Sequence, residues 1–164
     1  MDKIADKIYL GDCHSARNEE KILSYNIKRV LSCMGKLSPK YKDQTIKQMI
    51  IELEDTPSTN IIQYFKDSIK FIDENEEDKV LIHCFAGVSR SAALVIAYLM
   101  WKKKSTYEEC YNLVKDHRFI GPNMGFRKQL LIFEEKLKNS DYDLNKIDFE
   151  NVNWPPLEGI NKLC

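Results

Sequence analysis

Short apolar runs alternate with helical periods along most of this chain, and this alternation restricts its fold more than any other feature. Residues 7–10, 28–33, 49–53 and 80–83 form runs with the length and composition of strands. Strands that alternate with helices are typical of a mostly parallel sheet with helices on both faces. We therefore expect an α/β fold with a twisted, mostly parallel central sheet flanked by helices.

Five helices are expected between and after these strands. Apolar residues in the intervening segments recur every three or four positions, as they do on the buried face of a helix. Most of these segments also begin with a side chain that can accept a hydrogen bond from the first helical turn. The expected helices start near Asn18, at Ser58 or Thr59, at Ser89, at a capping box of Ser105 with Glu108, and near Asn123.

Residues 1–138 carry this pattern and are interpreted as one domain, as expected for a chain of 164 residues. Beyond Lys138 the sequence is polar and has no period, so residues 139–164 are interpreted as a tail or linker. The alternative, that the chain is a piece of a longer protein, stays open.

Composition argues against several classes of protein. The 25 basic and 25 acidic residues cancel, whereas a nucleic-acid-binding protein usually carries a basic excess. No apolar run approaches the ~18–20 residues of a membrane-spanning helix, so no membrane insertion is expected. The five cysteines are widely spaced and form no metal-binding pair. We therefore expect reduced thiols, in the cytoplasm, the nucleus or both.

The segment that carries chemistry is residues 83–91. Its sequence, His-Cys-Phe-Ala-Gly-Val-Ser-Arg-Ser, lies between a buried strand and a helix. A loop in this position turns successive backbone N–H groups inward, and the following helix adds the positive end of its dipole. Arg90 can donate two further N–H bonds to one anion. The expected phosphate site is formed by Phe85, Ala86, Gly87, Val88, Ser89 and Arg90.

Cys84 lies at the base of this expected site. Inward N–H groups and Arg90 favour its thiolate over its thiol, whose ordinary pKa is ~8.5. The thiolate is expected to attack phosphorus and form a phosphocysteine, and Ser91 to hydrogen-bond the sulfur and help it to leave. The alternative is a buried structural cysteine.

His83 has two interpretations, as a strand-end histidine whose hydrogen bonds are satisfied or as a residue that orders the loop. A metal site of His83 with Cys84 is not expected, because adjacent strand residues point to opposite faces.

Residues 83–91 resemble the signature of the cysteine-dependent dual-specificity protein phosphatases, which belong to the protein tyrosine phosphatase superfamily. The likeness extends from about residue 4 to residue 137. It includes Ile8-Tyr9-Leu10-Gly11 near the start, and Pro122, Asn123, Gly125, Phe126, Gln129, Leu130 and Glu134 near the end. The resemblance implies a mostly parallel sheet flanked by helices, a catalytic domain over residues 1–138, and a reaction without metal or organic cofactor.

The family also uses an aspartate general acid on a separate upstream loop, and Asp55 in Leu-Glu-Asp-Thr-Pro matches that place. An acid is needed because a serine or tyrosine oxygen leaves poorly without a proton. Glu54 is the rival candidate, and the alternative role for Asp55 is to cap the turn that follows.

Phosphorylated proteins are the substrates that the resemblance implies, at phosphotyrosine and at phosphoserine or phosphothreonine. So short a chain has little room for the insertion that deepens the pocket of tyrosine-specific relatives. Related phosphoinositide phosphatases carry basic loop residues, whereas residues 85–89 have none. An RNA 5′-phosphatase gains little support from a net charge of zero. A non-catalytic phosphoprotein-binding module stays open as the alternative from another class.

Cys33 ends a predicted strand, as Cys84 does, and parallel neighbours would bring both to one sheet edge. One hypothesis is that peroxide links them in a protective disulfide. The alternative is that Cys33 is a small buried residue. Activity that peroxide abolishes equally and permanently in the wild type and in Cys33→Ser would rule out the disulfide.

Overall fold

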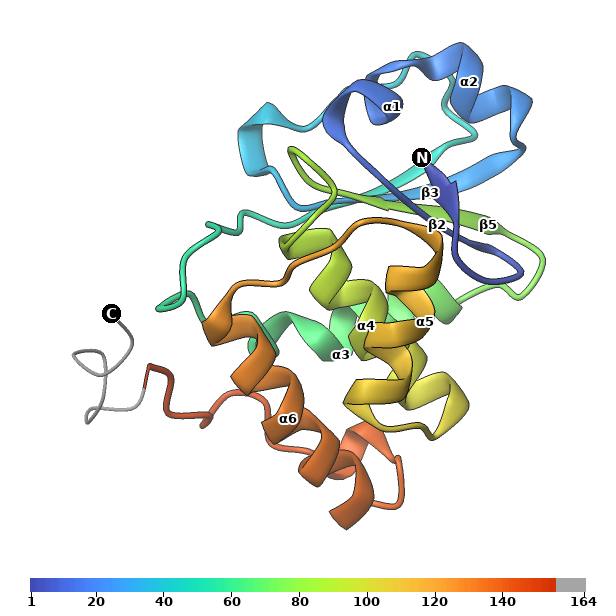
Figure 1. Ribbon diagram of the computed structural model, residues 1–164. Helices are drawn as coiled ribbons and strands as arrows, with labels where there is room; N and C mark the ends of the chain where they lie inside the picture. The colour runs from blue at the N-terminus through green and yellow to red at the C-terminus, as the bar shows by residue number, and fades with distance from the viewer. Residues whose placement is uncertain (156–164) are drawn as a thin grey trace.

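Five strands form one sheet in the order β1-β2-β5-β3-β4 in the computed structural model, which describes residues 1–155 (Figure 1). β1 is antiparallel to β2, and every other neighbouring pair is parallel. The strands are β1 (Asp2–Lys3), β2 (Ile8–Gly11), β3 (Ile27–Ser32), β4 (Lys47–Ile50) and β5 (Lys79–His83). The predicted α/β class with a mostly parallel sheet is confirmed.

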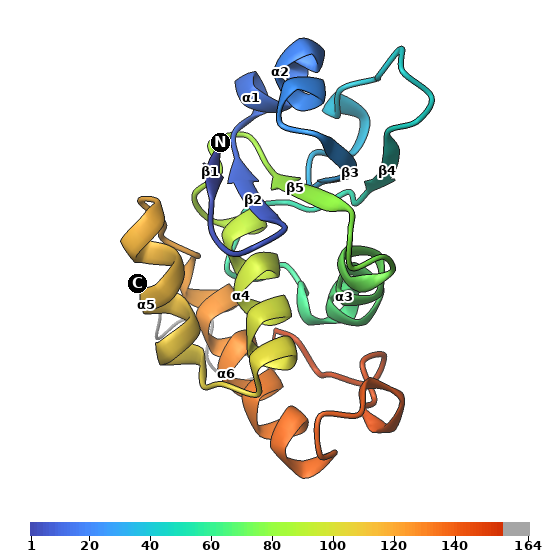
Figure 2. The ribbon, with the colours of Figure 1, turned by 90° about the vertical axis from the view of Figure 1, so that its right-hand side faces the viewer.

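Helices cover both faces of this sheet (Figure 2). On one side lie α1 (Cys13–Arg17) and α2 (Glu19–Ser24). The other side carries α3 (Phe65–Asp73), α4 (Arg90–Lys103), α5 (Tyr107–His117) and α6 (Met124–Asn139). Three short 3₁₀ helices complete the described part: η1 (Gly35–Leu37), η2 (Ile62–Tyr64) and η3 (Leu144–Lys146). No helix within residues 1–155 has both the length and the apolar character that crossing a membrane requires.

The two faces enclose separate hydrophobic cores, because successive side chains of a strand point to opposite sides. In β5, Val80 and Ile82 join the large core under α3–α6, whereas Leu81 joins the small core under α1 and α2. Every residue of α4 from Ser91 to Met100 is buried. The central helix and the central strand are therefore both immobilised by packing, and the loop between them is held at two rigid ends.

The third strand was predicted two to three residues too far toward the C-terminus. Residues 49–53 were expected to form it, but β4 ends at Ile50. Its partner β3 ends at Ser32, after which the chain turns into η1, so no strand remains for later residues to pair with. Ile51 and Leu53 are buried in the large core instead, and this burial accounts for their apolar character.

The predicted start of the second helix is also wrong. Neither Ser58 nor Thr59 caps it; the segment begins at Ile62 as η2 and continues as α3. The Gln129 side chain of α6 supplies the missing acceptor, because its Oε1 accepts the N–H groups of Ile61 and Ile62 at 2.9 and 3.1 Å. A cap that arrives from another helix leaves no local signal in the sequence.

The other predicted helix starts agree more closely with the structure. Asn18 caps α2 and Asn123 caps α6, each through its side-chain oxygen, as expected. The expected capping box is displaced by one residue, because Thr106 pairs with Glu109 rather than Ser105 with Glu108. Both pairs have the spacing of a capping box, so the sequence pattern alone does not choose between them.

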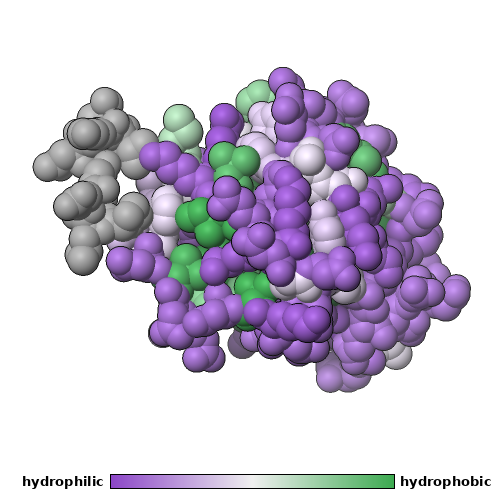
Figure 3. Space-filling model, turned by 90° about the horizontal axis from the view of Figure 1, so that it is seen from below, coloured by the Kyte–Doolittle hydropathy of each residue, from purple (hydrophilic) through white to green (hydrophobic). Residues whose placement is uncertain are grey.

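Beyond α6 the described part of the predicted tail turns back onto the domain. Leu144, Ile147 and Phe149 are buried in the large core, and the Phe149 ring lies 5.9 Å from that of Phe133. The Trp154 indole N–H donates to the Pro57 carbonyl at 3.1 Å. The surface on this side is mostly hydrophilic, with a small group of apolar residues (Figure 3). The boundary at residue 138 stays a prediction, and residues 156–164 lie outside the described part.

Candidate active site

Residues 84–89 form a loop between β5 and α4, at the carboxyl edge of the parallel strands, which is where α/β folds bind ligands. β3 pairs with β5 so that Ser32 lies opposite His83. Cys33 and Cys84 therefore leave the same edge of the sheet, as the strand positions predicted, and the Cys33 N–H donates to the His83 carbonyl at 2.9 Å.

The carbonyl groups of this loop are held from outside it. Because the C=O and N–H of a planar trans peptide point in opposite directions, carbonyls that face outward direct the N–H groups of residues 86–89 inward. The inward N–H groups give the loop the donors that an anion site requires, and phosphate binding by residues 85–90 stays a prediction. The bonds, all of 2.9–3.0 Å, run from Cys13 N to Phe85 O, from Arg118 to Ala86 O and Gly87 O, and from Gly121 N to Val88 O.

Arg118, which the sequence analysis missed, supplies two of these four bonds. Its Nε donates to Gly87 O and its Nη2 to Ala86 O, both at 3.0 Å, while its Nη1 pairs with Asp2 at 2.6 Å. The guanidinium is thus engaged through all three nitrogens and holds the loop as a brace. Arg118 lies 28 residues beyond the motif's Arg90 and nothing local marks it, so only the fold reveals this role.

Gly87 is required by the backbone at the middle of the loop. Its φ of +67° lies in the region that side chains disfavour. A Cβ here would also overlap the Gly11 carbonyl and the Arg118 guanidinium. The close approach of Gly11 and Arg118 to the loop therefore depends on the missing side chain.

The Cys84 sulfur accepts two hydrogen bonds, from the Ser91 hydroxyl at 3.1 Å and from the Gly87 N–H at 3.2 Å. Burial, the largest single influence, raises the pKa of this thiol, but the bonds from Ser91 and Gly87 and the charge of Arg90 together outweigh it. The pKa of Cys84 is therefore lowered. The structure thus brings Ser91 to the sulfur.

The pKa of the Cys33 thiol shifts in the opposite direction from that of Cys84. Burial raises the pKa of the Cys33 thiol well above its ordinary value, and the negative charge of Cys84 adds to that shift. Cys33 therefore stays protonated where Cys84 ionises. The disulfide hypothesis for this pair stays a prediction.

Arg90 is anchored at one end of its guanidinium. Its Nη1 donates to the carbonyls of Cys33 and Leu53, at 3.2 and 3.1 Å. Its Nε is buried and has no hydrogen-bond partner within residues 1–155. A buried N–H without a partner is costly, so a ligand that accepts from it would be bound favourably. A phosphate oxygen is such an acceptor.

Asp55 lies on the loop between β4 and η2 and shares a pocket of about 430 Å³ with Cys84. Its Oδ1 accepts from the Ser89 hydroxyl at 2.7 Å and from the Asn123 side-chain amide at 2.8 Å. Glu54, the rival candidate, does not line the pocket. The lining residues are Asp55, Cys84, Phe85, Ala86, Val88, Ser89, Arg90, Gly121 and Asn123.

Asn123 connects the loop that carries Asp55 to the loop of residues 84–89, which is called the phosphate loop below after the anion site expected there. The sequence analysis did not identify this role. Its backbone N–H donates to the Ser89 hydroxyl at 3.0 Å, its side-chain Nδ2 donates to Asp55, and its side-chain Oδ1 caps α6 by accepting from the Phe126 N–H. Two residues later, in the first turn of α6, Gly125 packs so closely against Pro57 that a Cβ would overlap the Pro57 carbonyl. The N-terminus of α6 therefore positions Asp55 beside the loop.

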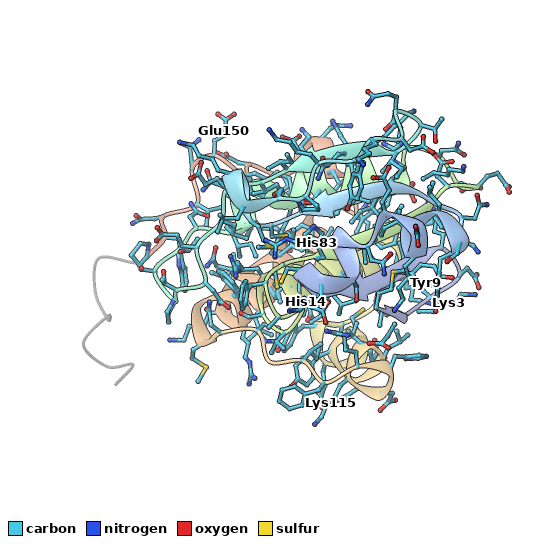
Figure 4. All side chains as sticks on the ribbon, turned by 90° about the horizontal axis from the view of Figure 1, so that it is seen from above. Lys3, Tyr9, His14, His83, Lys115 and Glu150 are labelled. Carbon is cyan, nitrogen blue, oxygen red and sulfur yellow. The ribbon has the colours of Figure 1, made fainter. Side chains whose placement is uncertain are left out.

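His83, the last residue of β5, is buried in the interior of the domain (Figure 4). Its Nε2 lies 2.6 Å from the Ser32 hydroxyl and its Nδ1 lies 3.3 Å from the Cys84 carbonyl. Burial lowers its pKa to about 4, so the ring is neutral at pH 7. Both ring nitrogens are engaged in structure, which agrees with a strand-end histidine that also orders the loop.

The lowered pKa of His83 predicts a loss of stability in acid. The folded-state pKa of about 4 lies below the ordinary 6.5, so the stabilisation is complete above pH 6.5 and falls as the pH drops toward 4. The free energy of unfolding should decrease by about 2 kcal/mol from this group between pH 7 and pH 5. Urea unfolding at both pH values measures it, and His83→Gln should remove that decrease. An equal decrease in both proteins contradicts the prediction.

The arrangement suits one kind of chemistry. A thiol that ionises readily lies among inward N–H donors and an arginine, which together fit a tetrahedral oxyanion. A carboxyl group from another loop lines the same pocket. Such a site can bind a phosphate monoester, attack its phosphorus and protonate the departing oxygen.

Comparison with known proteins supplies close relatives. The chain is 39% identical over 139 residues to dual specificity protein phosphatase 22-A of Danio rerio, a match that covers 83% of this chain and 66% of the relative. It is 36% identical over 141 residues to dual specificity protein phosphatase 1 of Arabidopsis thaliana, which covers 84% and 71%. This chain thus spans just under two thirds of the Danio relative's length.

A solved structure, the human tyrosine phosphatase-like serine/threonine/tyrosine-interacting protein, is similar with a TM-score of 0.76 and 31% identity over 82% of this chain and 95% of that one. The family model described as dual specificity phosphatase, catalytic domain, matches residues 8–136. That match includes the phosphate loop, Asp55, Arg118 and Asn123. This chain therefore belongs to the family of dual specificity phosphatase catalytic domains.

Proposed function

We propose that this protein is a protein phosphatase that hydrolyses phosphotyrosine and phosphoserine or phosphothreonine through a phosphocysteine on Cys84. The observation that carries the proposal is the environment of the Cys84 sulfur. It accepts from Ser91 and Gly87 at the base of a pocket that Asp55 and Arg90 also line. The similarity to proteins named as dual specificity phosphatases supports the same activity.

In the first step, the Cys84 thiolate attacks phosphorus as the bond from phosphorus to the substrate oxygen breaks. The inward N–H groups of residues 86–89 and the Arg90 guanidinium stabilise the charge on the three equatorial oxygens. Asp55 donates its proton to the departing oxygen, so the product leaves as a neutral alcohol or phenol. The enzyme is left with a phosphocysteine and an ionised Asp55.

In the second step, the Asp55 carboxylate takes a proton from a water molecule that attacks the phosphocysteine. The bond between phosphorus and sulfur breaks, and inorganic phosphate is released. The Ser91 hydroxyl, 3.1 Å from the sulfur, stabilises the departing thiolate, as does the Gly87 N–H. Asp55 and Cys84 are returned to their starting states without metal or organic cofactor.

Protein substrates are favoured over phosphoinositides by the side chains around the phosphate. Residues 85–89 carry no charge, so the loop offers a second phosphate group no partner. Nucleic acid is disfavoured by the balanced charge of the chain. We also propose the cytoplasm or nucleus as the compartment, because the reaction needs a reduced Cys84. Imaging of the tagged full-length protein tests the compartment.

The test is hydrolysis of p-nitrophenyl phosphate by the purified, reduced protein in EDTA, followed by matched phosphotyrosine, phosphoserine and phosphothreonine peptides. Chelator-resistant release of phosphate from all three peptides supports the proposal. Release from phosphotyrosine alone would narrow it to a tyrosine phosphatase. Phosphopeptide binding without release would instead establish a non-catalytic binding module.

The brace formed by Arg118 predicts a loss of activity at a distance from the reacting atoms. Arg118→Met removes the two bonds that hold Ala86 O and Gly87 O outward, so the N–H groups of the loop lose their fixed direction. We expect kcat/KM to fall about 10- to 100-fold and inhibition by orthovanadate to weaken similarly.

Asp2→Asn is the matched control for Arg118→Met, because it weakens the ion pair with Nη1 and leaves both carbonyl bonds in place. Its kcat/KM should change less than about threefold. Unchanged kinetics in a folded Arg118→Met would show that the loop holds its conformation without the brace.

A further inference from the structure

We propose that Phe85, Phe119 and Met124 form an apolar collar at the mouth of the pocket, and that this collar binds a large apolar side chain next to the phosphorylated residue of the substrate. This inference rests on the proposed phosphatase function and deepens it, because it names the class of phosphoprotein sequence that the site prefers.

The collar residues are unusually exposed for their size. The exposed fractions are 61% for Phe85, 82% for Phe119 and 54% for Met124. Eight large apolar side chains are exposed within residues 1–155, and the collar residues are three of the four most exposed. A group of exposed apolar side chains beside a binding site is typical of an interaction surface.

The backbone brings these three residues to the pocket or next to it. Phe85 lines it directly. Phe119 and Met124 belong to the connection from α5 to α6, and each lies within two residues of a lining residue, Gly121 or Asn123. Figure 1 shows this connection passing beside the loop that follows β5.

The connection is fixed to the phosphate loop along its length. Arg118 bonds Ala86 O and Gly87 O, the Gly121 N–H bonds Val88 O, and the Asn123 N–H bonds the Ser89 hydroxyl. The backbone on both sides of Phe119 is therefore held before any substrate arrives. A preformed surface binds with a smaller ordering cost than a mobile one.

The side chains around the mouth of the pocket indicate which kind of substrate residue binds there. The charged residues that line the pocket, Asp55 and Arg90, are assigned to the phosphate group and its leaving oxygen. Residues 85–89 and 119–124 add no charged side chain, so these two segments offer no ion pair to acidic or basic residues that flank the phosphate. The phosphate is held at the base of the pocket, so the residues beside it must cross the rim. An apolar side chain at that point removes the collar's surface from water together with its own.

The experiment uses phosphotyrosine peptides that differ at one position, from two residues before the phosphotyrosine to two after it, where Ser, Glu or Phe is placed. We expect Phe to raise kcat/KM about tenfold over Ser at one or two positions through a lower KM, and Glu to bring no gain. Phe119→Ser and Met124→Ser should lose this preference. Neither should change kcat/KM for p-nitrophenyl phosphate, which has no flanking residues to contact Phe119 or Met124.

Leu131→Ser is the matched control, because Leu131 is 50% exposed on α6 but lies two turns beyond Met124. It should keep the preference for Phe. Equal kcat/KM for all peptides, with normal turnover of p-nitrophenyl phosphate, overturns the collar and leaves the phosphatase function intact. No turnover of any substrate overturns the phosphatase function itself.

Two other occupants give distinct results. If the collar covers a second copy of this chain, Phe119→Ser shifts the size-exclusion volume and the peptides show no preference. If it meets a lipid surface, Phe119→Ser abolishes binding to phosphatidylcholine vesicles, again without a peptide preference. Either result overturns the proposal.

Discussion

Cys84→Ser is expected to lower kcat for p-nitrophenyl phosphate by about 10⁴-fold or more, because an un-ionised hydroxyl replaces the only proposed nucleophile. The hydrogen bonds and the arginine charge that lower the pKa of Cys84 act on a thiol, whose ordinary pKa of ~8.5 is many units below that of an alcohol. The same field is far too weak to ionise a serine hydroxyl. Steady-state kinetics in EDTA measure the loss.

The Cys84→Ser variant should still bind phosphopeptides. Serine leaves the N–H groups of residues 86–89 and the Arg90 guanidinium in place, so a phosphotyrosine peptide should still bind and stay intact. Calorimetry with that peptide separates a lost nucleophile from a lost fold. Cys33→Ser is the matched control at the same sheet edge, and its kcat should stay within about threefold of the wild type because its thiol, whose pKa is raised by burial, takes no part in the attack.

The ionisation of Cys84 can be measured separately, by its rate of alkylation. Because the pKa of Cys84 is lowered, iodoacetamide should alkylate Cys84 faster than an ordinary thiol at the same acidic pH, for example pH 6. Ser91→Ala removes one of the bonds that lower this pKa, so alkylation at pH 6 should slow. Full turnover in Cys84→Ser would contradict the whole mechanism.

The phosphate loop was predictable because its parts are adjacent in sequence. A buried strand to His83, a glycine in the middle and a helix from Arg90 determine one local geometry, and Cys84 and Ser91 follow from it. The strand–helix alternation likewise predicts the sheet and most helices. Local patterns of this kind are read from neighbouring residues, so one sequence is enough.

Features that depend on distant residues were missed or misplaced. Arg118 braces a loop 31 residues earlier in the chain, and Gln129 caps a segment 68 residues earlier. Asn123 was expected only as a helix cap, yet it also bonds Asp55 and Ser89. Each of these contacts forms only when the fold brings two segments together, so no spacing in the sequence predicts it.

Asp55→Asn is expected to lower kcat/KM about 10²- to 10³-fold for phenyl phosphate, a substrate whose leaving oxygen needs a proton. The asparagine keeps the size of the side chain but cannot donate the proton that Asp55 is proposed to supply. The loss should be smaller for p-nitrophenyl phosphate, because its phenolate is a stable anion that departs with little help.

The dependence on the leaving group separates acid catalysis from structural damage. A series of aryl phosphates with rising leaving-group pKa should show a steeper fall in kcat/KM for Asp55→Asn than for the wild type. Asn123→Ala should give a smaller loss with the same trend, because Oδ1 of Asp55 keeps the Ser89 bond and loses only the amide. Glu54→Gln is the matched control and should leave the series unchanged, since Glu54 does not line the pocket. Equal losses across the series in Asp55→Asn would mean that Asp55 shapes the pocket without donating a proton.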